Sequence, residues 1–201
     1  MKTSTRYCQN GFSVFQLLLG VSIVGLLSAG AVPSFENSIK DNRLNAALVG
    51  MMAEMEYARS EAVKRNASVT ICASTDQATC DTQDWEEGRL VFIDDGAGTA
   101  SNAGNGVVNS ETILKTFQSI DGGITLTPQG LSTPGYIVFA DDGSVNTSGT
   151  VVFCDNRGAS DASTAEAVNV NIVGQVRPAY DSNSTTDKIV NDIAGANVSC
   201  S

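Results

Sequence analysis

The stretch that decides the fold is GFSVFQLLLGVSIVGLLSAGAVPSF, residues 11–35. Its residues 12–32 form a run of 21 without a charge, of which 14 are apolar, three are Gly and four are Ser or Gln. At about 1.5 Å per residue, a helix of this length spans roughly 30 Å, which is enough to cross the hydrocarbon core of a bilayer. The sequence therefore predicts an apolar helix over residues 12–33 that anchors the protein in a membrane.

The residues before this run favour one orientation in the membrane. MKTSTRYCQNG, residues 1–11, carries Lys2 and Arg6 and no acid, and basic residues beside a span stay on the cytoplasmic side. The rest of the chain is then expected outside the cytoplasm. A cleaved secretory signal is the alternative, with the small residues 28–31 as its cleavage site.

Composition excludes several function classes. The chain has 201 residues, 42% of them hydrophobic, which is enough for one globular domain with an extension. Twelve basic side chains against 22 acidic ones give a net charge of −10, which disfavours a protein held on nucleic acid by overall charge. The absence of histidine excludes His-based triads and imidazole metal sites.

Paired acids are the remaining hint of catalysis or metal binding. Asp94-Asp95 and Asp141-Asp142 could hold calcium or act as an acid and a base. Both pairs stand beside Gly in expected turns, where Asp is favoured for backbone reasons. We therefore predict a protein that is not an enzyme and that needs no cofactor and no metal.

Beyond Pro33 the pattern predicts an α+β fold. A helical stripe continues the helix to about residue 65 and comprises Leu44, Leu48, Met51, Met55, Ala58 and Ala62. Short β runs follow, at 69–73, 89–94, 112–118, 124–127, 136–140, 150–154 and 167–173. Residues 141–143 predict a hairpin turn, and 94–109 a long mobile loop. We expect one long helix, bent at Pro33, packed on an antiparallel sheet.

The cysteines indicate an oxidising compartment. Cys8 lies in the leader, which leaves four cysteines: Cys72, Cys80, Cys154 and Cys200. Four cysteines permit three pairings, which the sequence alone does not resolve. The natural choice joins Cys72 to Cys80 around a short loop, and Cys154 to Cys200, which ties the tail to a strand. A zinc site is the competing interpretation, and the lack of any C-x-x-C spacing argues against it.

The junction at Gly11-Phe12 resembles the class III signal of type IV pilins and type II secretion pseudopilins. The resemblance implies that a prepilin peptidase cleaves after Gly11 and methylates Phe12. Residues 1–11 would be the leader, 12–33 the membrane and later filament-core helix, and 34–201 the exposed head. Pro33 lies at the usual helix-bending position, whereas Gln16 replaces a Glu that would pair with the N-terminal amine of a neighbouring subunit. Gln16 indicates either a minor, tip-proximal subunit or simple tolerance of an isosteric amide.

Motifs in the head narrow the resemblance. The segments LNAALVGMMAEMEYARSEAVKRNASVTIC, DWEEGRLVFID, GYIVFADDGSV and TVVFCDNRG resemble the FimT/FimU–GspH group of minor pilins and pseudopilins. This implies a minor pilin incorporated in, or priming, a type IV pilus; the alternative is a GspH-like pseudopilin of a type II secretion system. The implied partners are other minor pilins, the major pilin or pseudopilins, together with the prepilin peptidase. The implied location is the inner membrane, with the head in the periplasm, and later the pilus at the cell surface.

A DNA-binding role is the weakest implication. Some FimT-like members capture DNA through a Gly-Arg-x-Arg pattern near the last strand. Here the matching residues are Gly174-Gln175-Val176-Arg177, so the first Arg is missing and Arg177 is the sole candidate contact. One cation is a weak attraction for phosphate on an acidic chain, and nucleic acid is not expected as a partner.

Overall fold

The computed structural model describes residues 11–96, 102–120, 122–131, 133, 135–157, 164–182 and 188–200, with the backbone alone at 29–34. Cys8 and the expected leader, except Gly11, lie outside these residues. The chain divides into two compact units, Met1–Lys40 and Asp41–Ser201. One helix, α1 (Val14–Arg65), contributes to both.

In the first unit, two local hydrogen bonds cap the N-terminus of α1. The Ser13 hydroxyl accepts a hydrogen bond from the Phe15 amide at 3.3 Å, and the Gln16 side-chain oxygen accepts one from the Ser13 amide at 3.1 Å. These two bonds satisfy amides that have no partner in the first turn, which explains why the helix begins at Val14. The helix continues through Pro33, and the bend expected there stays a prediction. In the described parts of the chain, no helix is both long and apolar enough to span a membrane.

The described residues of the second unit form two antiparallel sheets, where the sequence predicted one. The first sheet has the order β3 (Ile113–Phe117), β2 (Arg89–Ile93), β1 (Val69–Ala73), β5 (Tyr136–Phe139). The second has the order β4 (Thr125–Gln129), β6 (Gly149–Cys154), β7 (Glu166–Val170), β8 (Val176–Pro178). Seven of these strands lie where the sequence predicted them; β8 was missed. The hairpin turn at 141–143 is also present, since Gly143 N–H donates to the Ala140 carbonyl at 2.8 Å.

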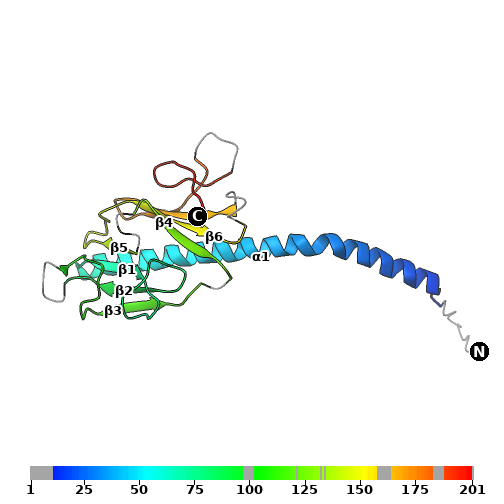
Figure 1. The fold of residues 1–201 in the computed structure, drawn as a ribbon, viewed down its shortest axis with the longest axis horizontal. Coiled ribbons are helices and arrows are strands. Elements are labelled where there is room, and N and C mark those ends of the chain that lie inside the picture. Colours follow the sequence, from blue (N-terminus) through cyan, green and yellow to red (C-terminus); the bar gives the residue numbers. More distant parts are fainter. Residues whose placement is uncertain are drawn as a thin grey trace, which may run out of the picture. The chain divides into compact units, whose positions relative to one another are not determined.

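The second half of α1 packs on both sheets and forms the main core with them. Figure 1 shows this part of the helix, in cyan, beside β1 and β2 of one sheet and near β4 and β6 of the other. The predicted helical stripe is at most 5% exposed and lies in one cluster with residues from both sheets, including Ile71, Val91, Phe153 and Val168. Trp85 belongs to this cluster and not to the one around Cys72, so its side chain is part of the main core. The α+β fold class, with one long helix packed on antiparallel sheet, is confirmed.

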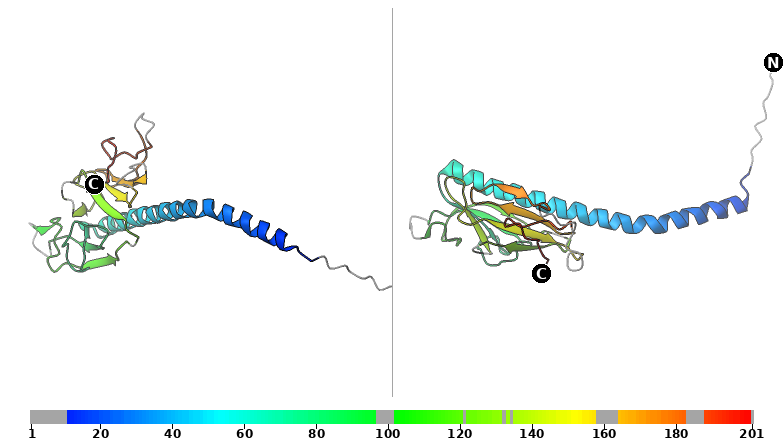
Figure 2. Two further views of the ribbon diagram at one scale, coloured as in Figure 1. Left: turned by 45° about the vertical axis from the view of Figure 1, so that its right-hand side comes forward. Right: turned by 90° about the horizontal axis from the view of Figure 1, so that it is seen from above.

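Each sheet is also covered on its outer face. On the first sheet, Cys72, Leu90 and Phe92 pack with Val108 and Tyr136. On the second, the C-terminal segment, red in Figure 2, brings Val198 against residues of β6 and β7. This double cover explains why β1 and β6 are buried along their whole length.

Candidate functional site

The described part of the first unit presents an exposed apolar surface. The large apolar side chains between Phe12 and Leu27 are 49–90% exposed. Along one side runs a shallow groove of about 430 Å³, lined by Phe12, Gln16, Leu17, Gly20, Val21 and Val24. An apolar surface of this kind is what a subunit buries against lipid or against another helix. Phe12 and Gln16 both line this groove, so the structure brings together the predicted processing residue and the predicted packing residue.

The capping bond gives Gln16 a role within its own chain. The Gln16 side-chain oxygen is the acceptor for the Ser13 amide, and an amide oxygen performs this role without a charge. Helix initiation at Val14 therefore needs no glutamate at position 16. This bond does not decide between the two interpretations of Gln16 given above.

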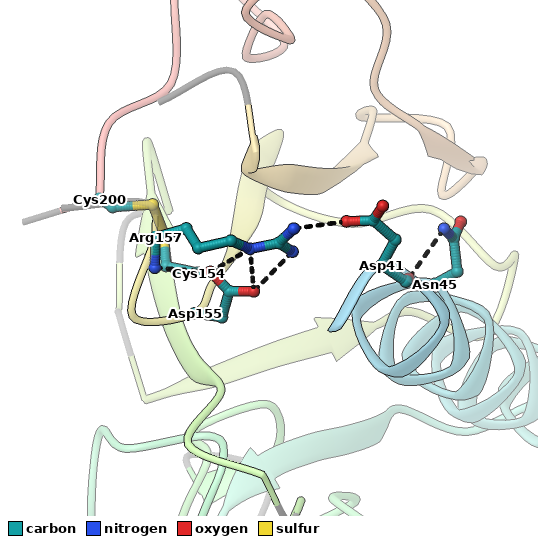
Figure 3. A network of polar contacts seen from close by, with 6 residues as sticks. All are labelled: Asp41, Asn45, Cys154, Asp155, Arg157 and Cys200. Carbon is teal, nitrogen blue, oxygen red and sulfur yellow. Dashed lines mark hydrogen bonds and ion pairs between the residues drawn. A yellow bond between two sulfur atoms is a disulfide. The ribbon is translucent and has the colours of Figure 1, made fainter. Parts of the chain in front are cut away.

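In the second unit, Arg157 joins α1 to the end of β6 (Figure 3). Its Nη1 donates to Asp41 at 2.7 Å, and its Nη2 donates to Asp155 at 2.7 Å. The Arg157 amide also donates to Asp155 at 2.8 Å. The Asp155 carboxylate, followed by that of Asp41, raises the pKa of the Arg157 guanidinium. The local sequence around Arg157 does not indicate this link to the helix, because Asp41 lies 116 positions earlier in the chain.

Near this ion pair, the surroundings of Glu166 at the start of β7 disfavour its charged form. Burial raises the pKa of the Glu166 carboxyl, and the negative charge of Asp41 raises it further. Asp41, the first residue of the second unit, therefore acts on both groups. It forms an ion pair with Arg157, and its negative charge disfavours the ionised form of Glu166.

Arg59 ties the other end of α1 to two turns. Its Nε donates to the Gly143 carbonyl at 3.0 Å, and its Nη2 donates to the Val173 carbonyl at 3.2 Å. Gly174 has φ +73°, and a Cβ there would lie 1.9 Å from the Gly143 oxygen. The glycine that opens the Gly174–Arg177 pattern is thus required by the close approach of two turns, with no reference to a ligand.

The predicted acid pairs serve the fold. Asp94 is fully buried and accepts hydrogen bonds from Thr70 Oγ1 at 2.6 Å and from the amides of Gly104 and Gly106 at 2.9 Å each. The interpretation of Asp94 as an ordinary turn residue is therefore wrong, because its carboxylate holds the following loop on the first sheet. Asp142 accepts the Ser144 amide within the hairpin turn. Among the described residues, no group of three or more Cys, Asp or Glu is arranged to hold a metal.

The four cysteines form two disulfides, Cys72–Cys80 and Cys154–Cys200. These are the pairs predicted from the sequence among the three possible pairings. The second bond lies next to the Arg157 ion pairs (Figure 3) and fixes the end of the tail to the last residue of β6. Both outer covers of the head are thus secured close to a cross-link.

The loop inside the first disulfide carries a strongly acidic carboxyl. Asp76 accepts hydrogen bonds from the Ala78 and Thr79 amides, each at 2.8 Å, which lowers the pKa of Asp76 to about 2. A carboxyl with a lowered folded-state pKa stabilises the fold above its unfolded pKa, and this contribution is lost as the pH falls through the folded value. We expect the Asp76 carboxyl carbon to titrate near pH 2 by NMR. A midpoint for Asp76 near 3.9 would contradict the two amide bonds.

Arg177, the candidate DNA contact, lies on β8 and is exposed. It is paired across the sheet with Asn169 of β7. The described lining around it holds one acid, Asp192, and no second basic residue. The structure therefore does not gather a basic patch around Arg177.

Comparison with known proteins shows which family and which solved structures the chain resembles. Residues 50–174 match the family model described as type II transport protein GspH. The structure resembles the crystal structure of the type IV minor pilin FimU of Pseudomonas aeruginosa, with a TM-score of 0.52 and 20% identity over 73% of this chain and 96% of that one. The minor pseudopilin EpsH of the Vibrio cholerae type 2 secretion system is more distant, with a TM-score of 0.45 and 14% identity over 68% of this chain and 95% of that one. No curated protein sequence matches the chain. With more than half of its length matched, the chain belongs to the GspH family, and it shares the fold of the minor pilin FimU.

Proposed function

We propose that the protein is a minor pilin incorporated in, or priming the assembly of, a type IV pilus. The exposed apolar side chains between Phe12 and Leu27 carry this proposal, because burying them among the helices of other subunits supplies the free energy of assembly. The likeness to the FimU fold over nearly its whole length supports the pilus version. Before assembly, residues 12–33 hold the subunit in the inner membrane with its head in the periplasm. Prepilin peptidase cleaves between Gly11 and Phe12.

The second candidate is a pseudopilin of a type II secretion system. The description of the matching family, type II transport protein GspH, favours it. Both machines bury the same apolar helix, so the identity of the neighbouring subunits is what separates them. The neighbours would be minor and major pilins in one case and pseudopilins in the other.

The test is chemical crosslinking in the native membrane, followed by purification of the full chain and mass spectrometry of its partners. Recovery of type IV minor pilins supports the proposal, whereas recovery of pseudopilins assigns the protein to the secretion filament. A mature chain that starts after Ala31 instead of at Phe12 would contradict both the minor pilin and the pseudopilin assignment.

A matched pair of variants shows whether the contacts run through the helix. Leu18 and Ile172 are 59% and 61% exposed, one on α1 and one in the turn after β7. We expect Leu18→Lys to abolish the crosslinks, because a charge in this run is costly to bury. Ile172→Lys should keep them. Equal loss in both variants would argue against assembly through the helix.

A further inference from the structure

A cleft of about 370 Å³ lies between the outer face of the second sheet and the C-terminal segment. Its lining includes Asn169 on β7, Arg177 on β8, and Tyr180, Asn191, Asp192 and Ile193 on the segment that follows. None of these residues belongs to the exposed apolar segment from Phe12 to Leu27 on which the proposed function rests. We propose that this cleft binds a neutral saccharide, an activity that goes beyond subunit assembly.

The floor of the cleft is fixed by buried hydrogen bonds. Asn191 is 1% exposed; its side-chain oxygen accepts from the Ser182 amide at 2.6 Å, and its Nδ2 donates to Asn197 at 2.8 Å. Asn169 donates to the Asn191 carbonyl at 3.2 Å and accepts from Thr150 Oγ1 at 2.6 Å. A floor whose own polar groups are satisfied holds its shape before a ligand arrives.

Three other groups in the lining of the cleft remain available for a ligand. The Arg177 guanidinium makes no hydrogen bond or ion pair with the described residues, and the Tyr180 side chain is 71% exposed. Asp192 uses one oxygen, Oδ1, to accept the Ala194 and Ala196 amides, and its Oδ2 accepts from no described residue. Arg177 and Asp192 line one cleft without pairing with each other.

The balance of these groups selects the ligand class. A polyanion such as nucleic acid needs several cations, whereas the lining offers one arginine and one aspartate on a chain of net charge −10. A docked amphipathic helix needs a continuous apolar groove, and here Asn, Arg, Asp and Ser interrupt the apolar lining. Hydroxyl groups both donate and accept, so neighbouring hydroxyls of a sugar fit a carboxylate and a guanidinium together. The apolar face of a sugar ring can pack on the exposed tyrosine ring.

The test is an NMR titration of the full chain, labelled with ¹⁵N, in a detergent that has no sugar headgroup. The probes are neutral hexoses, N-acetylhexosamines and their β-1,4-linked disaccharides, together with a single-stranded decanucleotide as the polyanionic counterpart. We expect saturable shifts at amides within 169–182 and 188–195 with at least one saccharide. If no saccharide gives a saturable shift, the proposal is wrong. Binding of the oligonucleotide that is tighter than that of every saccharide would also overturn it.

Variants separate the cleft from the rest of the surface. Tyr180→Ala and Arg177→Ala should each weaken binding about tenfold, which corresponds to about 1.4 kcal/mol. Tyr180→Phe should retain most of the affinity, because the ring is kept. Asp192→Asn keeps the oxygen that accepts the turn amides and should weaken binding through loss of the charge. Arg43→Ala changes an exposed arginine of α1 outside the cleft and is the matched control. Binding that is unchanged in both alanine variants of the cleft would refute the assignment.

Discussion

Replacing Glu54 with alanine should lower the free energy of unfolding of the head by about 3–5 kcal/mol. The Glu54 carboxylate on α1 binds Arg89 of β2 through two bonds, 2.6 Å to Nε and 2.9 Å to Nη2. The Arg89 side chain is only 4% exposed, so it cannot turn to water when its partner is removed. Its remaining bond, from Nη1 to the Trp85 carbonyl at 2.7 Å, does not neutralise the charge. The expected loss is therefore that of an uncompensated buried cation.

The helix supplies a matched control two residues away. Glu56 lies 3.9 Å from Arg59, and its side chain is 49% exposed, so Glu56→Ala should cost less than about 1 kcal/mol. Urea unfolding of the full chain can be followed through the fluorescence of Trp85, which is the only tryptophan and is fully buried in the head. Glu54→Leu combined with Arg89→Met should recover most of the lost stability. Equal midpoints for Glu54→Ala and Glu56→Ala would show that the buried pair contributes little.

The elements with a strong local pattern were predictable from the sequence. The stripe from Leu44 to Ala62 repeats at helical spacing, and all six of its members are buried. The β1 and β2 runs are rich in branched and aromatic residues and lie where they were predicted. By contrast, β8 has only three residues, two of them exposed, and ends in Pro178, so no alternation marks it. The division into two sheets depends on which strands pair, and the sequence of a strand does not show which other strand it pairs with.

The head's polar contacts were less predictable, because their partners lie far apart in the chain. Asp41 and Arg157 are 116 positions apart, and neither stands in a pattern that marks an ion pair. The glycine two positions after Asp94 predicted a turn residue, but the Asp94 carboxylate binds backbone amides at 104–106. Any residue could supply such amides, so the sequence does not mark them. The disulfides were accessible because four cysteines leave only three pairings. The available groups of the cleft could not be predicted from the sequence, since Asp192 and Tyr180 line the same cleft as Arg177 only after the tail has folded onto the sheet.

The tail gives the second large prediction. Cys154→Ala with Cys200→Ala should lower the unfolding free energy by about 4 kcal/mol, and Cys72→Ala with Cys80→Ala by about 2.5 kcal/mol, because the closed loop is longer in the first case. The bonds join residues 46 and 8 positions apart, respectively. Urea unfolding of the full-length variants, followed by Trp85 fluorescence, measures both losses. An equal or reversed order would contradict the loop-length argument.

The two losses should also differ in where they appear. Without Cys154–Cys200, the tail is held by a small cluster around Val152, Ala167 and Val198 and by the hydrogen bonds of Asn191. Segments with so little buried apolar surface open before the rest of the fold. Hydrogen exchange at residues 188–200 should therefore accelerate well before that of β1, and Asp192 should leave the cleft together with the tail. Saccharide binding would then be lost in Cys154→Ala/Cys200→Ala and retained in Cys72→Ala/Cys80→Ala, at urea concentrations where Trp85 is still buried. Retained protection of 188–200 in the first variant would mean that noncovalent packing alone fixes the tail.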